Sequence, residues 1–345
     1  MTKSAERPKW TQPLKPPPRR GPIPAPRSQR RPPVIEVSSS PHIRDTVTTR
    51  RLMLDVVFAL IPALAAAFYF FGPRTLAVVA VSISSAVLFE YICRRLLKRY
   101  NSIGDLSAVV TGFLLALNLP PKIPYYIVII GAFIAIVIVK QLFGGIGNNI
   151  VNPAMAARVV LTISFPSAMS RWVIMGEHAI GETVDFVSSA TPLYILQSGG
   201  EMPGYLDLFI GHKAGCLGEV SIAALSIGIV YLLVRKVITL WIPFSYIATV
   251  AAITAIAGQN PLYHVLSGGL ILGAFFMATD YVTSPLTSKG KVIFGIGCGV
   301  ITAMIRLFGS MSEGVSFSIM LMNMLTPTIE QFTTPKVFGG GEARA

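Results

Sequence analysis

The chain has 345 residues, of which 52% are apolar and only 13% are charged, and its mean hydropathy is +0.63. Soluble globular domains carry about a quarter charged residues, so this composition excludes an ordinary soluble protein and indicates an integral membrane protein. The formal net charge is +13, and most of it lies in one segment at the N-terminus.

That segment, residues 1–34, holds ten prolines and nine lysines or arginines against a single acid, Glu6. A segment of this composition cannot bury a core, so we expect a disordered or polyproline-like cytoplasmic tail. We expect the basic tail to lie near anionic lipid headgroups. The alternative, that residues 15–19 are a PxxP ligand, is less favoured. Because no folded nucleic-acid-binding module accompanies the charge, we predict no nucleic-acid partner.

Long apolar runs after residue 50 predict membrane-spanning helices, each of which needs about 20 apolar residues. Five runs precede a polar interval at 167–215, and the third and fifth of them are short. They lie near Leu52–Phe71, Leu76–Ile92, Leu106–Leu119, Tyr125–Phe143 and Pro153–Phe165. Five more runs follow the interval, near 217–234, 237–257, 262–279, 292–308 and 315–329.

Ten spans assign each loop to one of the two sides of the membrane, and lysine and arginine are distributed unevenly between these sides. The side that holds the basic tail also holds Arg94, Arg95, Lys98, Arg99, Arg235, Lys236, Lys289, Lys291, Lys336 and Arg344. The opposite side receives only Arg74, Lys122, Arg171, Lys213 and Arg306. Since basic loops mark the cytoplasmic side, we predict cytoplasmic termini and an interval at 167–215 that lies outside.

The two groups of five spans resemble each other, and an odd number of spans places two copies in opposite orientations. Asn118 before a Pro-Pro pair is echoed by Asp280 before Pro285, and residues 142–145 are echoed by residues 307–310. Short segments interrupted by Pro or Gly in both halves are typical of broken helices that meet near the membrane midplane. The alternative is that these breaks are ordinary loops.

We therefore predict an all-α polytopic membrane protein with about ten transmembrane helices in two inverted five-helix repeats that contain short or broken helices. The repeats occupy 35–166 and 216–330, separated by an extracytoplasmic loop at 167–215 and followed by a cytoplasmic tail at 331–345. The cysteines and histidines show no metal-ligand or redox spacing, so we predict no metal held by this chain alone. They are Cys93, Cys216, Cys298, His42, His178, His212 and His264.

The interval at 167–215 contains Asp185-Phe-Val-Ser-Ser-Ala-Thr191. Ser188, Ser189 and Ala190 are small, which leaves the Thr191 hydroxyl uncrowded. Pro192 disfavours the α conformation at the residue before it. We expect an extended loop that is open to a modifying enzyme, and the alternative is an ordinary surface turn.

This order of residues resembles the motif at which flavin transferases attach FMN, through its phosphate, to a Thr or Ser hydroxyl. Five further blocks occur in the order of one family, which includes the D subunit of the Rnf electron-transport complex and the B subunit of the sodium-pumping NADH:quinone reductase. They are Ser38–Arg44, Gly112–Pro121, Leu142–Met155, Phe276–Pro285 and Asn323–Pro327. The chain is identified as a member of this family over roughly residues 35 to 330. Its Ser189 departs from the family, which more often has Gly there.

The resemblance implies covalent FMN on Thr191, within the motif that also contains Asp185, Ser188, Ser189 and Ala190. It also implies riboflavin, held without a covalent bond, near Asn149 and Asn152. Amides suit an uncharged heterocycle because they offer donors and an acceptor without a buried charge. The competing interpretation is that these amides only cap helix ends.

The resemblance further implies a complex that moves electrons between reduced ferredoxin and NAD and couples this to Na⁺ or H⁺ translocation across a bacterial or archaeal cell (inner) membrane. Its partners would be the A, B, C, E and G subunits, a flavin transferase and membrane lipid. The chain has no Rossmann fingerprint, P-loop or cysteine cluster, so we predict a subunit that has no catalytic residues of its own.

Two charged residues near the breaks are further candidates for the cofactor site. Arg158 lies within the fifth span, where an arginine is costly and usually has a functional partner. We expect it to neutralise Asp280 or Asp55, or to face a flavin, and the alternative is a structural arginine that reaches the interface. Asp280 suits a cation path or the polar edge of a flavin.

Two other functions fit parts of this pattern. A channel or secondary transporter for a small solute also uses inverted repeats with broken helices, but it needs no modified threonine. The B-type subunit of a sodium-pumping quinone reductase shares the motifs, and the short C-terminus here favours the Rnf type.

Overall fold

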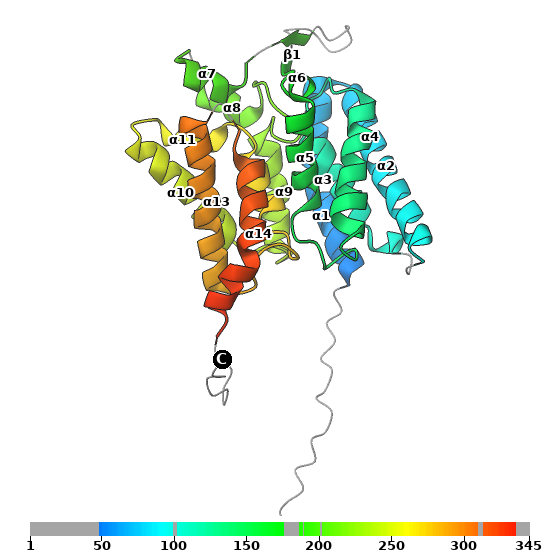
Figure 1. The fold of residues 1–345 in the computed structure, drawn as a ribbon. Helices are drawn as coiled ribbons and strands as arrows, with labels where there is room; N and C mark the ends of the chain where they lie inside the picture. Colours follow the sequence, from blue (N-terminus) through cyan, green and yellow to red (C-terminus); the bar gives the residue numbers. More distant parts are fainter. Residues whose placement is uncertain are drawn as a thin grey trace, which may run out of the picture. The chain divides into compact units, whose positions relative to one another are not determined.

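The computed structural model describes residues 48–98, 102–175, 186–188, 190–200, 202–309 and 313–335. All of them belong to one unit of the chain, which extends from Val47 to the C-terminus. Nearly every element of this unit is a helix, as Figure 1 shows, and the helices fall into two groups separated by a segment of small elements.

The first group begins with α1 (Thr49–Phe71) and α2 (Arg74–Leu96), and a short 3-10 turn η1 (Ile103–Asp105) follows. It continues with α3 (Ser107–Leu117), with α4 (Tyr125–Phe133), which runs into the π-helix η2 (Ile134–Gln141), and with α5 (Pro153–Ser164). A helix occupies each of the five predicted positions, to within a few residues. Local chemistry explains several boundaries, since the Thr48 hydroxyl caps α1 and Asn152 caps α5, whose first residue is a proline.

The polar interval contains small elements rather than one extended loop. It holds α6 (Pro166–Met169), the strands β1 (Val173–Met175) and β2 (Phe186–Ser188), α7 (Pro192–Ser198) and α8 (Tyr205–Ile210). The two strands pair antiparallel, with Val173 opposite Ser188.

The second group begins with α9 (Ile222–Val234) and α10 (Trp241–Ile256). Its third member is divided into α11 (Pro261–Leu266), α12 (Leu270–Leu272) and the π-helix η3 (Gly273–Met277), followed by α13 (Ser288–Phe308) and α14 (Val315–Thr333). The predicted span at 262–279 is therefore interrupted. The interruption falls at Gly268, whose φ of +68° is a left-handed conformation that favours glycine.

Three helices in the described part of the chain are long and apolar enough to cross a membrane, judged by length and composition: Thr49–Phe71, Arg74–Leu96 and Ser288–Phe308. Five shorter apolar helices accompany them, at Ser107–Leu117, Tyr125–Gln141, Pro153–Ser164, Ile222–Val234 and Trp241–Ile256. Large apolar side chains are exposed on the outer faces of the helices, among them Phe58, Leu88, Phe244 and Ile256. An apolar outer surface of this kind is typical of contact with lipid.

The broken ends of α3 and η3 lie against each other. The Asn118 side-chain nitrogen, just after α3, is 3.5 Å from the sulfur of Met277, the last residue of η3. The segment before α9 satisfies backbone groups at this break, because the amides of Gly218 and Leu217 donate to the carbonyls of Leu117 and Leu119 at 2.7 and 3.1 Å. Interrupted helices can lie inside a membrane protein when other parts of the protein satisfy their backbone in this way.

Figure 1 also shows where the ends of this unit lie. The start of α1 and the end of α14 are at one end of the helices, and α6, α7 and β1 are at the opposite end. Thr191, the residue before α7, therefore lies at the end away from both termini of the described helices.

Helices α1 and α9 pack closely where Gly228 faces Ala59. A Cβ atom at Gly228 would come far inside van der Waals contact of the Ala59 carbonyl oxygen, which belongs to rigid helix backbone. We expect Gly228→Ala to separate the two helices and to lower stability by about 1–3 kcal/mol, the usual cost of overpacking.

The measurement is the thermal midpoint of the purified protein, followed by size-exclusion chromatography after heating. Gly104→Ala is the matched control, because no atom lies within 4 Å of a Cβ built at Gly104. An unchanged midpoint in Gly228→Ala would mean that the two helices are not in close contact there.

Candidate functional site

A pocket lies between the start of α1, the start of α3, the end of η2 and the segment after η3. Its volume is about 830 Å³, including the part that is open to solvent. Its walls are mainly apolar, with Leu52, Val56, Leu114, Phe275 and Phe276. Three of the predicted site residues, Asn149, Asn152 and Asp280, line it together with Thr111 and Lys140. Folding thus brings together residues from both halves of the chain.

The two amides in this pocket have different environments. The Asn152 oxygen accepts from the amides of Ala154 and Met155 at 3.0 and 3.3 Å, and its nitrogen donates to the Met277 carbonyl at 3.3 Å. Asn152 therefore caps α5, and it also lines the pocket. The side-chain oxygen of Asn149 is buried and has no hydrogen-bond partner among the described residues, so it can accept from a ligand.

Lys140, in the wall of the pocket, belongs to a buried ion pair that was not anticipated from the sequence. The Lys140 ammonium lies 2.7 Å from the Glu90 carboxylate and 2.6 Å from the Ser107 hydroxyl. The Ser102 hydroxyl donates to the other oxygen of Glu90 at 2.7 Å. With these donors the pair is hydrogen-bonded on both sides, as a buried ion pair must be.

The expected partners of Arg158 are wrong. Asp55 pairs instead with Arg235 at 3.2 Å and accepts from the Tyr231 hydroxyl at 2.9 Å. Asp280 accepts from the Thr283 hydroxyl at 3.1 Å. The acid that pairs with Arg158 is Glu313, in the segment between α13 and α14. Glu313 stands 155 residues away along the chain, and no motif indicated which of the distant acids would face Arg158.

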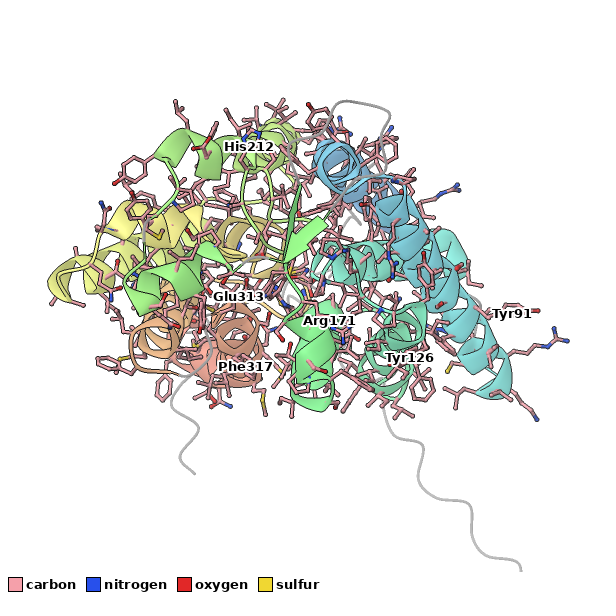
Figure 2. All side chains as sticks on the ribbon, turned by 90° about the horizontal axis from the view of Figure 1, so that it is seen from above. Tyr91, Tyr126, Arg171, His212, Glu313 and Phe317 are labelled. Atoms are coloured by element: carbon pink, nitrogen blue, oxygen red, sulfur yellow. The ribbon has the colours of Figure 1, made fainter. Side chains whose placement is uncertain are left out.

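Arg158 is buried and is the centre of a second polar group. Its guanidinium donates to the Asn118 side-chain oxygen at 2.7 Å, contacts the Cys216 sulfur at 3.3 Å and pairs with Glu313. The Cys216 amide in turn donates to Glu219 at 2.6 Å. Figure 2, a view from above, shows Glu313 among the helices, whereas Tyr91 lies at the edge.

Two further cations surround this group. Arg306 on α13 is buried and donates to the carbonyls of His264 and Ser267. The Lys213 ammonium donates to the Leu266 carbonyl at 2.6 Å, and burial lowers its pKa to about 8. These contacts hold the break between α11 and α12, where Gly268 lies, in place.

Side chains that can bind metals also meet here. The donor atoms of Cys216, Glu219 and Glu313 lie within 4.8 Å of one another. However, the Arg158 guanidinium contacts both Cys216 and Glu313, so a positive charge already lies among the three groups. The arrangement is that of a charge-balanced cluster rather than of a metal centre.

Thr191 lies elsewhere, at the start of α7, and its surroundings differ in part from the expectation. Its backbone is extended, with φ −68° and ψ 150°, as predicted from the proline that follows. Its side chain is not open, because the residue is only 4% exposed and its hydroxyl accepts from the Tyr194 amide at 3.3 Å. The pair Thr191-Pro192 is an N-cap followed by a first-turn proline, and this interpretation of the sequence was missed.

The other residues of the flavin-attachment motif are described only in part. Ser188 is the last residue of β2, and Ala190 is partly buried between β2 and α7. Asp185 and Ser189 lie outside the described residues. Thr191 is therefore the member of this motif whose side-chain contacts are established.

Comparison with known proteins is consistent with these motifs. The family described as NQR2, RnfD, RnfE matches residues 36–339. The D subunit of the Na⁺-translocating ferredoxin:NAD⁺ oxidoreductase complex of Acetobacterium woodii is 48% identical over 309 residues, which are 88% of this chain and 95% of that protein.

Two other relatives cover the chain to a similar extent. The D subunit of the proton-translocating ferredoxin:NAD⁺ oxidoreductase complex of Clostridium ljungdahlii is 42% identical over 89% of this chain and 96% of its own length. The D subunit of the ion-translocating oxidoreductase complex of Stutzerimonas stutzeri is 39% identical over 84% and 92%. Matches of this identity and coverage establish common descent along nearly the whole chain, and the protein therefore belongs to the NQR2, RnfD, RnfE family.

Proposed function

We propose that this chain is the D-type membrane subunit of an Rnf-type complex, which transfers electrons between ferredoxin and NAD and couples this to translocation of Na⁺ or H⁺. The observation that carries the proposal is the 48% identity to the D subunit of such a complex over 95% of its length. The chain's partners are then the other subunits of the complex. Since relatives are named for Na⁺ and for protons, the ion itself is not part of the proposal.

The arrangement of helices supports ten spans in two inverted repeats. Counting each interrupted helix as one span, α1 to α5 form the first repeat and α9 to α14 form the second. Equivalent members pack against each other across the two halves, since α1 contacts α9 and α5 contacts α14. The basic loops then place both termini in the cytoplasm and Thr191 outside.

The pocket that contains Asn149 and Asn152 supports a riboflavin site. A flavin ring is flat, largely apolar and edged with donors and acceptors, so it needs an apolar cavity with a few polar groups. The walls here are apolar, and the buried Asn149 oxygen has no partner among the described residues. The residues present therefore fit the ring, with Asn149 as the acceptor for one of its donors.

We expect Asn149→Ala to weaken riboflavin retention by about five- to tenfold, because a hydrogen bond in a buried site contributes about 1–1.5 kcal/mol. Folding should be unaffected, since the Asn149 oxygen has no protein partner among the described residues. The measurement is the amount of riboflavin released from the purified protein by denaturation, compared with the exposed neighbour variant Asn148→Ala. Equal riboflavin contents in the two variants would refute the assignment.

Thr191 is the proposed attachment point of FMN. Flavin accepts electrons singly or in pairs and so links one-electron carriers to others. Because the Thr191 hydroxyl is buried and bonded to the Tyr194 amide, a transferase requires the first turn of α7 to open. That turn belongs to a helix of seven residues, which is short enough to open locally.

The experiment is peptide mapping of the complex purified from a host that contains the flavin transferase. We expect a fluorescent band for this subunit in a denaturing gel and an FMN mass adduct on the peptide that contains Thr191. An unmodified Thr191 peptide at full coverage would contradict the covalent assignment and would favour the transporter interpretation.

A further inference from the structure

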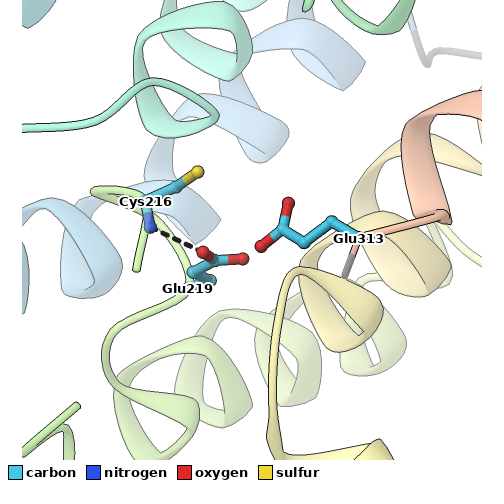
Figure 3. A group of neighbouring side chains, drawn as sticks. All are labelled: Cys216, Glu219 and Glu313. Carbon is cyan, nitrogen blue, oxygen red and sulfur yellow. Dashed lines mark hydrogen bonds between the residues drawn. The ribbon is translucent and has the colours of Figure 1, made fainter. Parts of the chain in front are cut away.

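Two carboxyl groups in the segments that precede α9 and α14 point toward each other, as Figure 3 shows. One oxygen of Glu219 accepts from the Cys216 amide at 2.6 Å, and one oxygen of Glu313 pairs with Arg158. The remaining oxygen of each carboxyl is buried and has no donor within the described ranges. One oxygen of each carboxyl nevertheless lies within 4.8 Å of the other group.

An ionised carboxylate has no hydrogen to donate. Two ionised groups in contact would therefore leave two buried acceptors unsatisfied and would repel each other. A single proton placed between them removes both costs, because one carboxyl then donates to the other. Carboxyl pairs that share a proton are known from enzyme active sites, where the two groups are too close to ionise together.

From this geometry we propose that Glu219 and Glu313 form a buried proton-binding site that holds one proton between the two carboxyl groups. Arg158, which pairs with Glu313 and contacts Cys216, balances the negative charge that remains. The ligand of the site is thus H⁺, and the site is distinct from the pocket that contains Asn149.

The other charged groups around the pair make a proton a better occupant than a metal ion. Arg158 on α5, Arg306 on α13 and Lys213 before α9 all act electrostatically on Glu313 or Glu219, and the buried Cys216 thiol is adjacent. Three cations around two carboxyl groups oppose the entry of a further cation. Burial, with the neighbouring Glu219 charge, raises the pKa of Glu313 to about 7.

The site lies on a chain of polar contacts that leads toward the pocket. Arg158 donates to the Asn118 side-chain oxygen at 2.7 Å, and the Asn118 nitrogen lies 3.5 Å from the Met277 sulfur. Asn152, in the pocket wall, donates to the Met277 carbonyl at 3.3 Å. If the proposed riboflavin site is correct, the charge of the bound flavin and the protonation of the Glu219–Glu313 pair can influence each other through these groups. The proton-binding site itself does not depend on that proposal.

The test is infrared spectroscopy of the full-length protein in its complex, in the carbonyl region of protonated carboxyl groups. We expect one band from a buried protonated carboxyl that shifts in D₂O and is lost as the pH rises through about 7. Both Glu219→Gln and Glu313→Gln should remove it, although each variant keeps one carboxyl. The glutamine amide supplies the donor that the shared proton supplied before, so neither variant needs that proton and both should fold.

The exposed variant Asp207→Asn is the control and should keep the band. Loss of the band in only one of the two Gln variants would show an ordinary protonated acid and would overturn the shared proton. Absence of the band in the native protein at every pH below 7 would overturn the site as a whole. Riboflavin content, measured in the same samples, separates this result from any failure of the proposed flavin site.

From the proposed proton-binding site we also predict how the stability of the folded protein depends on pH. The folded-state pKa of Glu313 is raised above the value of 4.5 for a free glutamate. The stabilisation of the folded state by protonated Glu313 is therefore fully present below pH 4.5 and is lost as the pH rises through about 7. We expect the thermal midpoint of the native protein to fall across this window. Glu313→Gln should lack that part of the fall, and a fall of equal size in both proteins would contradict the site.

Discussion

Replacement of Thr191 by alanine should abolish covalent flavin on this subunit, whereas Thr191→Ser should retain it. The phosphate ester needs a hydroxyl at this position, and serine keeps the hydroxyl while alanine removes it. Both variants should fold, because Thr191→Ser keeps the N-cap and its loss in Thr191→Ala costs about 1 kcal/mol. The measurement is in-gel fluorescence of the denatured subunit, with intact mass to count the adducts.

Ser198→Ala is the matched control, since it removes an exposed hydroxyl at the other end of α7, outside the motif, and should leave the adduct in place. A fluorescent band that persists in Thr191→Ala would assign the attachment to another residue. A band that is absent from the native protein as well would remove the covalent flavin from the proposed function while leaving family membership intact.

Replacement of Arg158 by methionine should destabilise the protein by about 3–5 kcal/mol, the usual cost of removing one partner of a buried ion pair. Arg158 is only 5% exposed, and its loss leaves Glu313 and the Asn118 oxygen without their donor. We expect a large fall in the thermal midpoint and a smaller yield of assembled complex. Both are measured by size-exclusion chromatography after heating.

A double variant separates the charge effect from the loss of packing. In Arg158→Met with Glu313→Gln, the direct partner of Arg158 is a neutral amide, and Lys213 and Arg306 still act electrostatically on Glu219. We therefore expect recovery of a large part of the lost stability. Arg171→Met, at an exposed position, is the control and should change stability by less than about 0.5 kcal/mol. Strictly additive effects of the two substitutions would show that Arg158 and Glu313 are not coupled.

The sequence predicted most of the fold because its evidence is local. Apolar runs, Asn152 before a proline and the Pro-Pro pair after α3 determine where helices begin and end without reference to distant residues. The break before α12 was less predictable. It depends on Gly268 and on the carbonyls that Arg306 and Lys213 hold in place, and these contacts exist only after α13 has packed.

The features of the candidate site were likewise predicted in part from the sequence and in part only from the structure. The motifs identified Asn149, Asn152 and Asp280, and the structure places all three in one pocket. They also identified Thr191 by its motif, but they indicated an open hydroxyl where the structure shows a buried one. Whether a loop hydroxyl is exposed depends on what packs over it, and residue order alone does not contain that information.

By itself, the sequence determined that this is a helical membrane protein of the NQR2, RnfD, RnfE family, because composition, periodicity and motif order are properties of the chain as written. Only the tertiary structure decided that Arg158 pairs with Glu313 and that Glu313 faces Glu219. A buried charge must find its partner among whichever segments the fold brings beside it, and these segments lie far apart along the chain.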